Sequence, residues 1–189
     1  MAQDDPAKTE TASSRGRVHH WLRVALIGRN PRVTLARIVV LVVTCFVLFK
    51  FVLLPIRVDG VSMFPTYKDK SVHFVNRLAY LDHEPQRGDV VGIRIGGGPN
   101  RFYRTPGLMY MKRIVGLPGE TLVFAGGRLF INGRAIDEPY VNGPCDWNSP
   151  PITIGQGQYF FVGDNRSMQR EYHVQGQAER DKIVGKVLF

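Results

Sequence analysis

The chain has 189 residues, a length that allows one domain or a small pair. Its 25 Lys and Arg outnumber its 16 Asp and Glu, and the formal net charge of +9 favours an anionic partner, either nucleic acid or a membrane surface. The two cysteines, Cys45 and Cys145, imply no disulfide framework. Neither they nor the five histidines have the spacing of a metal site, so we expect no bound metal.

Residues 1–37 form a basic N-terminal segment with seven basic and three acidic residues. Its first part, 1–18, is polar without an apolar period, which predicts largely disordered, cytoplasmic chain. In residues 20–28, apolar side chains surround Arg23. This stretch is compatible with a short interfacial helix that places Trp21 at the level of the lipid headgroups. A buried helix of a soluble domain is the alternative.

Residues 38–56 are apolar apart from Lys50, and a membrane-spanning helix needs about 20 such residues. Lys50 lies near the end of the run, where its amine can reach the interface, and Pro55 marks the predicted end of the helix. A cleavable signal peptide is the alternative, but its apolar core usually has about 7–15 residues. The preceding positive charge predicts a single-pass protein of the cell (inner or plasma) membrane. Its N-terminus would be cytoplasmic and residues 57–189 extracytoplasmic.

Residues 57–189 have the composition of a β domain. Short runs rich in Val, Ile, Phe and Tyr are separated by Gly, Pro, Asn and Asp. Residues 125–128 and 131–134 are typical of hairpin turns, and only 167–177 has any helical period. The predicted strands are 57–61, 71–77, 89–95, 109–115, 120–125, 128–132, 158–162 and 182–188, and the predicted long loops are 96–107 and 139–157.

Residues 57–67 are expected to form a stiff loop that presents the hydroxyl of Ser62. Gly60 allows backbone angles closed to other residues, and Pro65 restricts both itself and the residue before it. A serine hydroxyl becomes a good nucleophile only when a nearby base takes its proton. An ordinary turn serine is the alternative interpretation. The two apolar residues after the serine are candidates for packing in a core, at a membrane surface or against an apolar substrate: Met63 and Phe64.

Lys112 is the candidate base. It lies among the apolar residues Met111, Ile114 and Val115, where loss of hydration disfavours the charged amine and lowers its pKa. A neutral lysine amine can act as a general base towards a serine. Alternatively, Lys112 is a surface lysine on an alternating strand, with Arg113 on the opposite face.

Four sequence blocks follow the apolar run in a fixed order. They are Ser62, Met63, Pro65 and Thr66; Arg87 to Val91; Lys112, Arg113, Gly116, Pro118, Gly119 and Glu120; and Gly163 to Arg166. Together they resemble the type I signal peptidases (leader peptidases), a family of membrane-bound Ser/Lys proteases, over residues 38–189. The resemblance implies a mainly β, signal-peptidase-like catalytic domain after a single N-terminal transmembrane helix. It makes Ser62 the nucleophile and Lys112 the general base.

Two positions depart from the family's pattern. Some members have a serine two residues before the nucleophile whose hydroxyl helps to hold the oxyanion. Here that residue is Gly60, as in other members, so the backbone N–H of Ser62 is expected to carry more of this role. The fourth block is often followed by a serine that orients the lysine. Counting without gaps puts Gln169 at that place, and Ser167 is the other candidate for orienting Lys112. The same count puts Glu171 at an aspartate of the pattern and His173 at an arginine.

Other residues are expected to support the site. Asp164 and Arg166 are predicted to form a buried or half-buried ion pair with each other, and Met63 lies beside the nucleophile. Asp89 and Glu120 are predicted to cap turns.

The resemblance implies an endopeptidase that removes signal peptides from exported pre-proteins without a metal or cofactor. The implied partners are pre-protein signal peptides and membrane lipid, with the secretion translocon as a further candidate; nucleic acid is not expected. Two alternatives stay open. One is a specialised Ser/Lys maturation peptidase, such as one for conjugation pilins, and the other is an inactive membrane-tethered β domain that binds peptides. Self-cleaving repressors share the Ser/Lys pair, but the apolar run argues against a protein that diffuses to DNA.

Overall fold

The computed structural model describes residues 30–95, 108–141 and 143–188. The predicted disordered segment, the interfacial helix and the 96–107 loop therefore lie outside the described residues. The chain divides into two units, residues 1–48 and 49–189, and each is described by itself.

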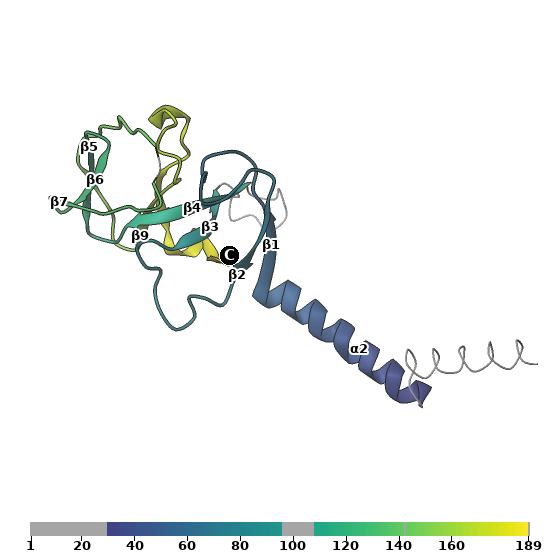
Figure 1. Cartoon of the computed structure of the whole chain (residues 1–189). Coiled ribbons are helices and arrows are strands. Elements are labelled where there is room, and N and C mark those ends of the chain that lie inside the picture. The colour runs from purple at the N-terminus through teal and green to yellow at the C-terminus, as the bar shows by residue number, and fades with distance from the viewer. Residues whose placement is uncertain (1–29, 96–107, 142, 189) are drawn as a thin grey trace, which may run out of the picture. The chain divides into compact units, whose positions relative to one another are not determined.

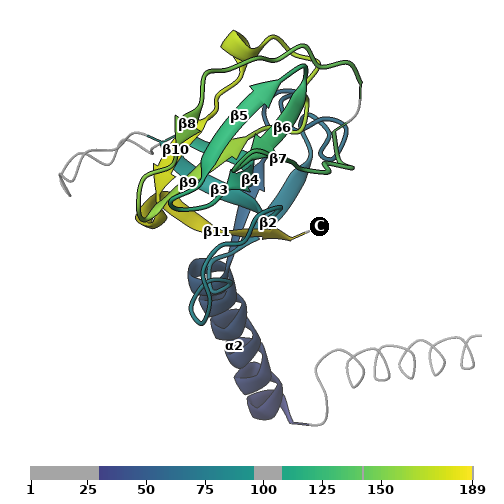
Figure 2. The ribbon, with the colours of Figure 1, turned by 90° about the vertical axis from the view of Figure 1, so that its left-hand side faces the viewer.

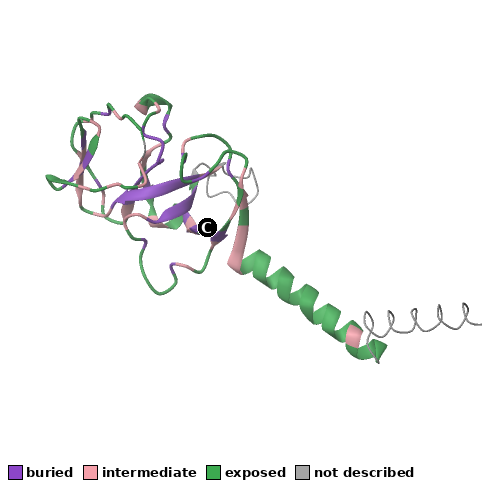
Figure 3. Ribbon diagram, in the orientation of Figure 1, coloured by how far each residue is buried: buried purple, intermediate pink, exposed green. Residues whose placement is uncertain are grey.

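A long apolar helix opens the described chain. Helix α2 spans Pro31–Val47 and continues as a π-helical turn, Leu48–Val52. The side chain of Asn30 accepts a hydrogen bond from the Arg32 N–H, and Pro31 occupies the first turn, where its missing N–H costs nothing. No residue of α2 is buried, and the 22 residues from Pro31 to Val52 are long and apolar enough to cross a membrane (Figure 3).

The predicted helix, residues 38–56, differs from α2 at both ends. The helix begins earlier than predicted, because the Asn30–Pro31 cap lies upstream of the apolar run. It also ends earlier than predicted, because residues 53–57 pair with another strand. Pro55 is tolerated there since this is the edge strand of its sheet, where one side of the backbone needs no partner.

Two antiparallel sheets form the second unit (Figures 1 and 2). In the larger sheet the strand order is β1-β2-β11-β3-β4-β9-β10, and in the smaller it is β7-β6-β5-β8. The larger sheet consists of β1 (Leu53–Arg57), β2 (Val72–Asn76), β3 (Val90–Ile95), β4 (Leu108–Gly116), β9 (Gln158–Val162), β10 (Gly176–Glu179) and β11 (Ile183–Leu188). The smaller sheet consists of β5 (Thr121–Ala125), β6 (Arg128–Ile131), β7 (Arg134–Ala135) and β8 (Ile152–Thr153). Two 3₁₀ turns, η2 (Arg170–Tyr172) and η3 (Arg180–Lys182), flank β10.

The mainly β class is confirmed, as are seven of the eight predicted strands and both hairpin turns. The strand predicted at 57–61 is wrong, because β1 ends at Arg57 and a turn-rich loop follows. Residues 167–177 contain only the three-residue turn η2 instead of a longer helix. The unpredicted strands β7 and β8 have two residues each, too few to show an alternating pattern, and β10 reads Gly-Gln-Ala-Glu, whose residues do not favour strands.

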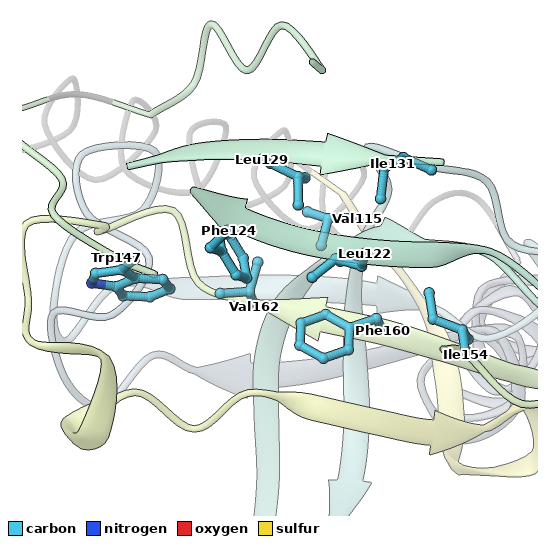
Figure 4. Close-up of a cluster of buried hydrophobic side chains, with 9 residues drawn as sticks. All are labelled: Val115, Leu122, Phe124, Leu129, Ile131, Trp147, Ile154, Phe160 and Val162. Atoms are coloured by element: carbon cyan, nitrogen blue, oxygen red, sulfur yellow. The ribbon is translucent and has the colours of Figure 1, made fainter. Parts of the chain in front are cut away.

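Apolar side chains from both sheets meet in one buried cluster (Figure 4). Phe124 on β5 packs with Val162 on β9 and Val115 on β4, so the smaller sheet covers one face of the larger. Trp147 closes the cluster with its ring edge against Phe124, at 5.5 Å between centroids. The full cluster is Val115, Leu122, Phe124, Leu129, Ile131, Trp147, Ile154, Phe160 and Val162.

The β5–β6 hairpin provides a first test of the fold. Its turn residues Gly126 and Gly127 both have positive φ, 55° and 74°, as a tight hairpin requires. A Cβ on Gly127 would lie 2.0 Å from the Cys145 carbonyl oxygen, whereas one on Gly126 would meet nothing within 4 Å. We expect Gly126→Ala to cost about 1 kcal/mol from backbone strain alone, and Gly127→Ala about 2 kcal/mol more because main chain must move. Urea unfolding of the two variants measures the difference, and equal losses would contradict the packing of residue 145 on this turn.

Candidate active site

The loop after β1 presents Ser62 at the surface while its neighbour anchors it. Met63 is 1% exposed and packs with Met111 and other side chains of a second buried cluster. Phe64 is 52% exposed. Met63 therefore packs in the core, which is one of the three environments predicted for Met63 and Phe64. Burying the residue next to Ser62 fixes the main chain that carries the hydroxyl.

A second contact holds this loop from the far end of the chain. The main-chain N–H of Asn165 donates to the Ser62 carbonyl at 3.0 Å, and the Asn165 side-chain amide donates to the Val61 carbonyl at 3.0 Å. Gly163 permits the approach, because a Cβ there would lie 2.2 Å from the Ser62 carbonyl oxygen. The first and fourth sequence blocks, about a hundred residues apart, thus form one unit.

Strand β4 carries Lys112 into the interior. It lies between β3, where Val91 is opposite Lys112, and β9, where Phe161 is opposite Ile114. Most of the β4 ribbon is coloured as buried (Figure 3). Lys112 is 3% exposed and its neighbour Arg113 is 8% exposed. The alternative of a surface lysine on a half-exposed strand is therefore wrong.

The lysine meets the serine. Lys112 Nζ lies 2.5 Å from Ser62 Oγ, within hydrogen-bond distance. Burial lowers the pKa of Lys112 from 10.5 to about 8, and the negative charge of Asp164 opposes this in part. With a pKa of about 8, about one amine in ten is neutral at pH 7 and about half are neutral at pH 8. A neutral amine at this distance can take the proton of the hydroxyl.

Asp164 and Arg166 do not form the predicted ion pair with each other. Asp164 accepts from Arg113 through both oxygens, at 2.8 and 2.6 Å, and from the Thr66 hydroxyl at 2.6 Å. Arg166 pairs with Glu138, at 2.6 and 3.1 Å. The two side chains separate because each completely buried group needs a partner with matching geometry, and a planar guanidinium binds both oxygens of a carboxylate.

The Arg166–Glu138 pair yields a stability prediction. Arg166 is 1% exposed, and its Nε also donates to the Gly163 carbonyl at 2.9 Å. Glu138→Ala leaves the guanidinium buried without its counter-charge, so we expect a loss of about 3–5 kcal/mol in the free energy of unfolding. The matched control is Asp181→Ala, which breaks an exposed pair with Lys182 and should cost under about 1 kcal/mol. Urea denaturation compares them, and a small loss for both would mean that Arg166 reaches solvent.

Neither candidate for orienting Lys112 is bonded to it. The Ser167 hydroxyl donates to the Asn165 side-chain oxygen at 2.6 Å, and Gln169 is exposed. Within the described residues, the hydrogen bond of Lys112 Nζ is the one to Ser62. The prediction that Ser167 or Gln169 contacts the lysine is therefore wrong, because the Ser167 hydroxyl is bonded to Asn165 instead and the Gln169 side chain faces solvent.

The main-chain N–H groups of Gly60 and Ser62 differ in whether they are already bonded. That of Gly60 donates to Asp69 at 2.7 Å, which holds a loop residue whose φ of 104° favours glycine. Among the described residues, no acceptor is bonded to the N–H of Ser62. The N–H of Ser62 is thus available to a new oxygen, whereas that of Gly60 is already bonded. Asp89 and Glu120 accept from the N–H groups of Gln86 and Leu117, so both cap turns as predicted.

Ser62 and Lys112 open on a groove of about 610 Å³. One wall is the main chain from Leu54 to Met63, and the other is residues 109–112 of β4. Three side chains beyond the fourth block complete it, namely Met168, Tyr172 and Val174. An extended chain fits between two strand-like walls, where it can bond to main-chain groups. Within the described residues, no group of three or more His, Cys, Asp or Glu could hold a metal ion.

Three residues at or behind the site were not predicted to act in it. Asn165 lies within the fourth block, but the sequence does not show which groups it binds. Glu138 directly precedes the predicted loop 139–157, and His173 is predicted only to stand at the place of an arginine in the family's pattern. Each is defined by a partner distant in sequence, which local patterns do not reveal.

A serine hydroxyl bonded to a buried lysine amine at the floor of an open groove has the geometry of a hydrolase with a serine nucleophile and a lysine base. Comparison with known proteins gives the family. The family model described as "Signal peptidase, peptidase S26" matches residues 32–189. The chain therefore belongs to the signal peptidases of the S26 family, which are serine endopeptidases.

Individual relatives agree. The chain is 30% identical to signal peptidase I of Leptolyngbya laminosa over 67% of its own length and 63% of that protein. It is also 30% identical to the probable signal peptidase I-1 of Synechocystis, over 80% of the chain and 78% of that protein, and to signal peptidase IB of Staphylococcus aureus, over 80% and 84%. A solved signal peptidase I from Enterococcus faecalis aligns with 56% of the chain and 97% of its own, at 25% identity and a TM-score of 0.41.

Proposed function

We propose that this protein is a membrane-anchored endopeptidase that removes N-terminal signal peptides from exported pre-proteins, with Ser62 as nucleophile and Lys112 as general base. The observation that carries the proposal is the 2.5 Å approach of a buried lysine amine to a serine hydroxyl that opens on a groove. Family membership supports the reaction, and the geometry supports the two roles.

The reaction proceeds in two steps. Ser62 Oγ attacks the scissile carbonyl carbon while its proton passes to Lys112 Nζ, and the N–H of Ser62 donates to the developing oxyanion. The carbon–nitrogen bond then breaks as the lysine ammonium returns the proton to the leaving amine, which leaves an ester on Ser62. Lys112 next takes a proton from water, the hydroxide oxygen attacks the ester, and Oγ leaves with that proton. The substrate lies extended in the groove, with small residues at the first and third positions before the cut.

The proposed anchor is the helix from Pro31 to Val52, which replaces the span predicted at 38–56. Basic residues before it would stay in the cytoplasm, so the β-rich catalytic domain would lie outside, facing membrane lipid and, in a further proposal, the translocon. We expect protease added to spheroplasts to digest the chain beyond Arg57 and to spare residues 1–37, as antibodies to each part would show. Digestion of the N-terminal part alone would contradict both the topology and the function.

Mass-spectrometric mapping of the products from a pre-protein incubated with the purified full-length enzyme tests the function. We expect one cut, after a small residue that has another small residue two positions before it. Cleavage of a single kind of precursor among several would favour the specialised maturation peptidase. Binding without any cleavage would favour the inactive peptide-binding domain and contradict the proposal.

A further inference from the structure

His173 lies buried behind the catalytic groove, outside the residues assigned to the chemistry. It is 6% exposed, and its ring packs edge-on against Trp147 at 4.9 Å between centroids. Its neighbours Tyr172 and Val174 both line the groove. The histidine is thus the buried member of an otherwise groove-lining segment.

A chain of hydrogen bonds leads from His173 to the main chain of Ser62 and its neighbour Val61. Nε2 of His173 lies 2.8 Å from the main-chain carbonyl oxygen of Asn165. Because a carbonyl only accepts, Nε2 must carry the proton in this contact. Asn165 in turn donates to the carbonyls of Ser62 and Val61, each at 3.0 Å. His173 therefore fixes the residue that binds the main chain of the serine loop at two points.

The imidazole is also in close packing with this loop. A Cβ on Gly163 would lie 2.4 Å from His173 Cε1 and 2.2 Å from the Ser62 carbonyl oxygen. The ring and the serine main chain therefore pack on the same glycine, with no side chain between them. The Ser167 hydroxyl bonds to the Asn165 side-chain oxygen at 2.6 Å, which leaves the amide nitrogen directed at Val61.

We infer that His173 is a positioning residue for Ser62: through Asn165 it holds the serine loop where Oγ meets the amine of Lys112. The inference rests on the proposed function. A displacement of about 1 Å between reacting groups can reduce the rate about 100-fold. A loop without regular secondary structure needs such external support, whereas Lys112 is already fixed within β4.

The surroundings of His173 favour a neutral imidazole, which carries one N–H donor instead of two. Burial is the main cause that lowers the pKa of His173, and the positive charges of Lys112 and Arg166 lower it further. The bond to Asn165 and the negative charge of Asp164 act in the opposite direction. Nδ1 has no hydrogen-bond partner among the described residues. A neutral ring protonated on Nε2 fits these surroundings, so the contact with Asn165 does not require a charged histidine.

Glutamine and asparagine at position 173 separate the two ring nitrogens. A glutamine amide reaches the place of Nε2 and can donate to Asn165, whereas an asparagine amide reaches only the place of Nδ1. A third variant, His173→Phe, keeps a ring against Trp147 but has no donor. We would purify the full-length variants in detergent, measure the folded fraction by thermal unfolding, and determine kcat and KM per folded molecule on a pre-protein.

We expect His173→Gln to keep kcat within about threefold of the wild type, and His173→Asn and His173→Phe to lower kcat about 100-fold with KM within about twofold. The groove wall should remain, because the Trp147 ring N–H holds the Met168 carbonyl at 2.8 Å. A wild-type kcat in the Asn and Phe variants would overturn the inference. So would a loss confined to KM, a loss accounted for by the folded fraction, or a glutamine variant as slow as the asparagine variant. Failure of the wild type to cleave would instead contradict the proposed function.

Discussion

Ser62→Ala should lower kcat on a pre-protein by at least about 10⁴-fold while the protein stays folded and inserted. Loss of the nucleophile removes the covalent route, and only binding and oxyanion stabilisation remain to assist attack by water. The Ser62 side chain is half-exposed and contributes little packing. Its removal costs the hydrogen bond with Lys112, about 1 kcal/mol of stability.

The matched control is Ser149→Ala. That hydroxyl accepts from the Phe124 N–H at 3.0 Å in the smaller sheet, so its loss should affect stability by a similar amount without slowing cleavage. Product formation followed by mass spectrometry, together with urea unfolding, separates chemistry from stability. Turnover in Ser62→Ala within tenfold of the wild type would remove this serine from the mechanism.

Activity should rise with pH and level off above about pH 8. The base must be neutral in the free enzyme, and burial lowers the pKa of Lys112 to about 8. Below that value, kcat/KM should fall about tenfold for each pH unit, since the neutral fraction does. Initial rates from pH 6 to 10 on one pre-protein would give the curve. A flat profile across pH 6–9 would exclude Lys112 as a base that titrates there.

Lys112→Met should abolish cleavage yet stabilise the fold at neutral pH. The folded pKa lies below the unfolded one of about 10.4, so the folded protein loses stability where it must hold the charged amine. This cost is complete below about pH 8, shrinks as the pH rises, and is absent above about pH 10.5. A pKa lowered by about 2.5 units corresponds to about 3 kcal/mol of stability that the variant regains at low pH. Loss of the hydrogen bond with Ser62 reduces this gain by about 1 kcal/mol.

Urea unfolding of wild type and Lys112→Met at pH 7 and pH 10 tests the sign. The variant should be more stable by about 1–3 kcal/mol at pH 7, and the advantage should nearly vanish at pH 10. A variant that is less stable at pH 7 would mean that the wild-type amine is held as a well-compensated cation. Cleavage by this variant at the wild-type rate would end the assignment of Lys112 as the base.

The sequence by itself determined the apolar helix, most strands and the pair that we propose as nucleophile and base, Ser62 and Lys112. These features are local: a run of apolar side chains, alternation between turn residues, and blocks such as Ser62–Thr66 with fixed spacing. Even there, the capping by Asn30 and the pairing of residues 53–57 changed the ends of the helix. A helix boundary depends on groups just outside the apolar run and on what pairs with the chain beyond it.

Only the tertiary structure decided how the site is held. Asp164 binds Arg113 rather than Arg166, and Arg166 binds Glu138. Neither choice follows from spacing, because a buried charge pairs with whichever partner the fold brings into bonding geometry. The same holds for His173, whose carbonyl partner on Asn165 is a main-chain atom and leaves no mark in the amino-acid sequence.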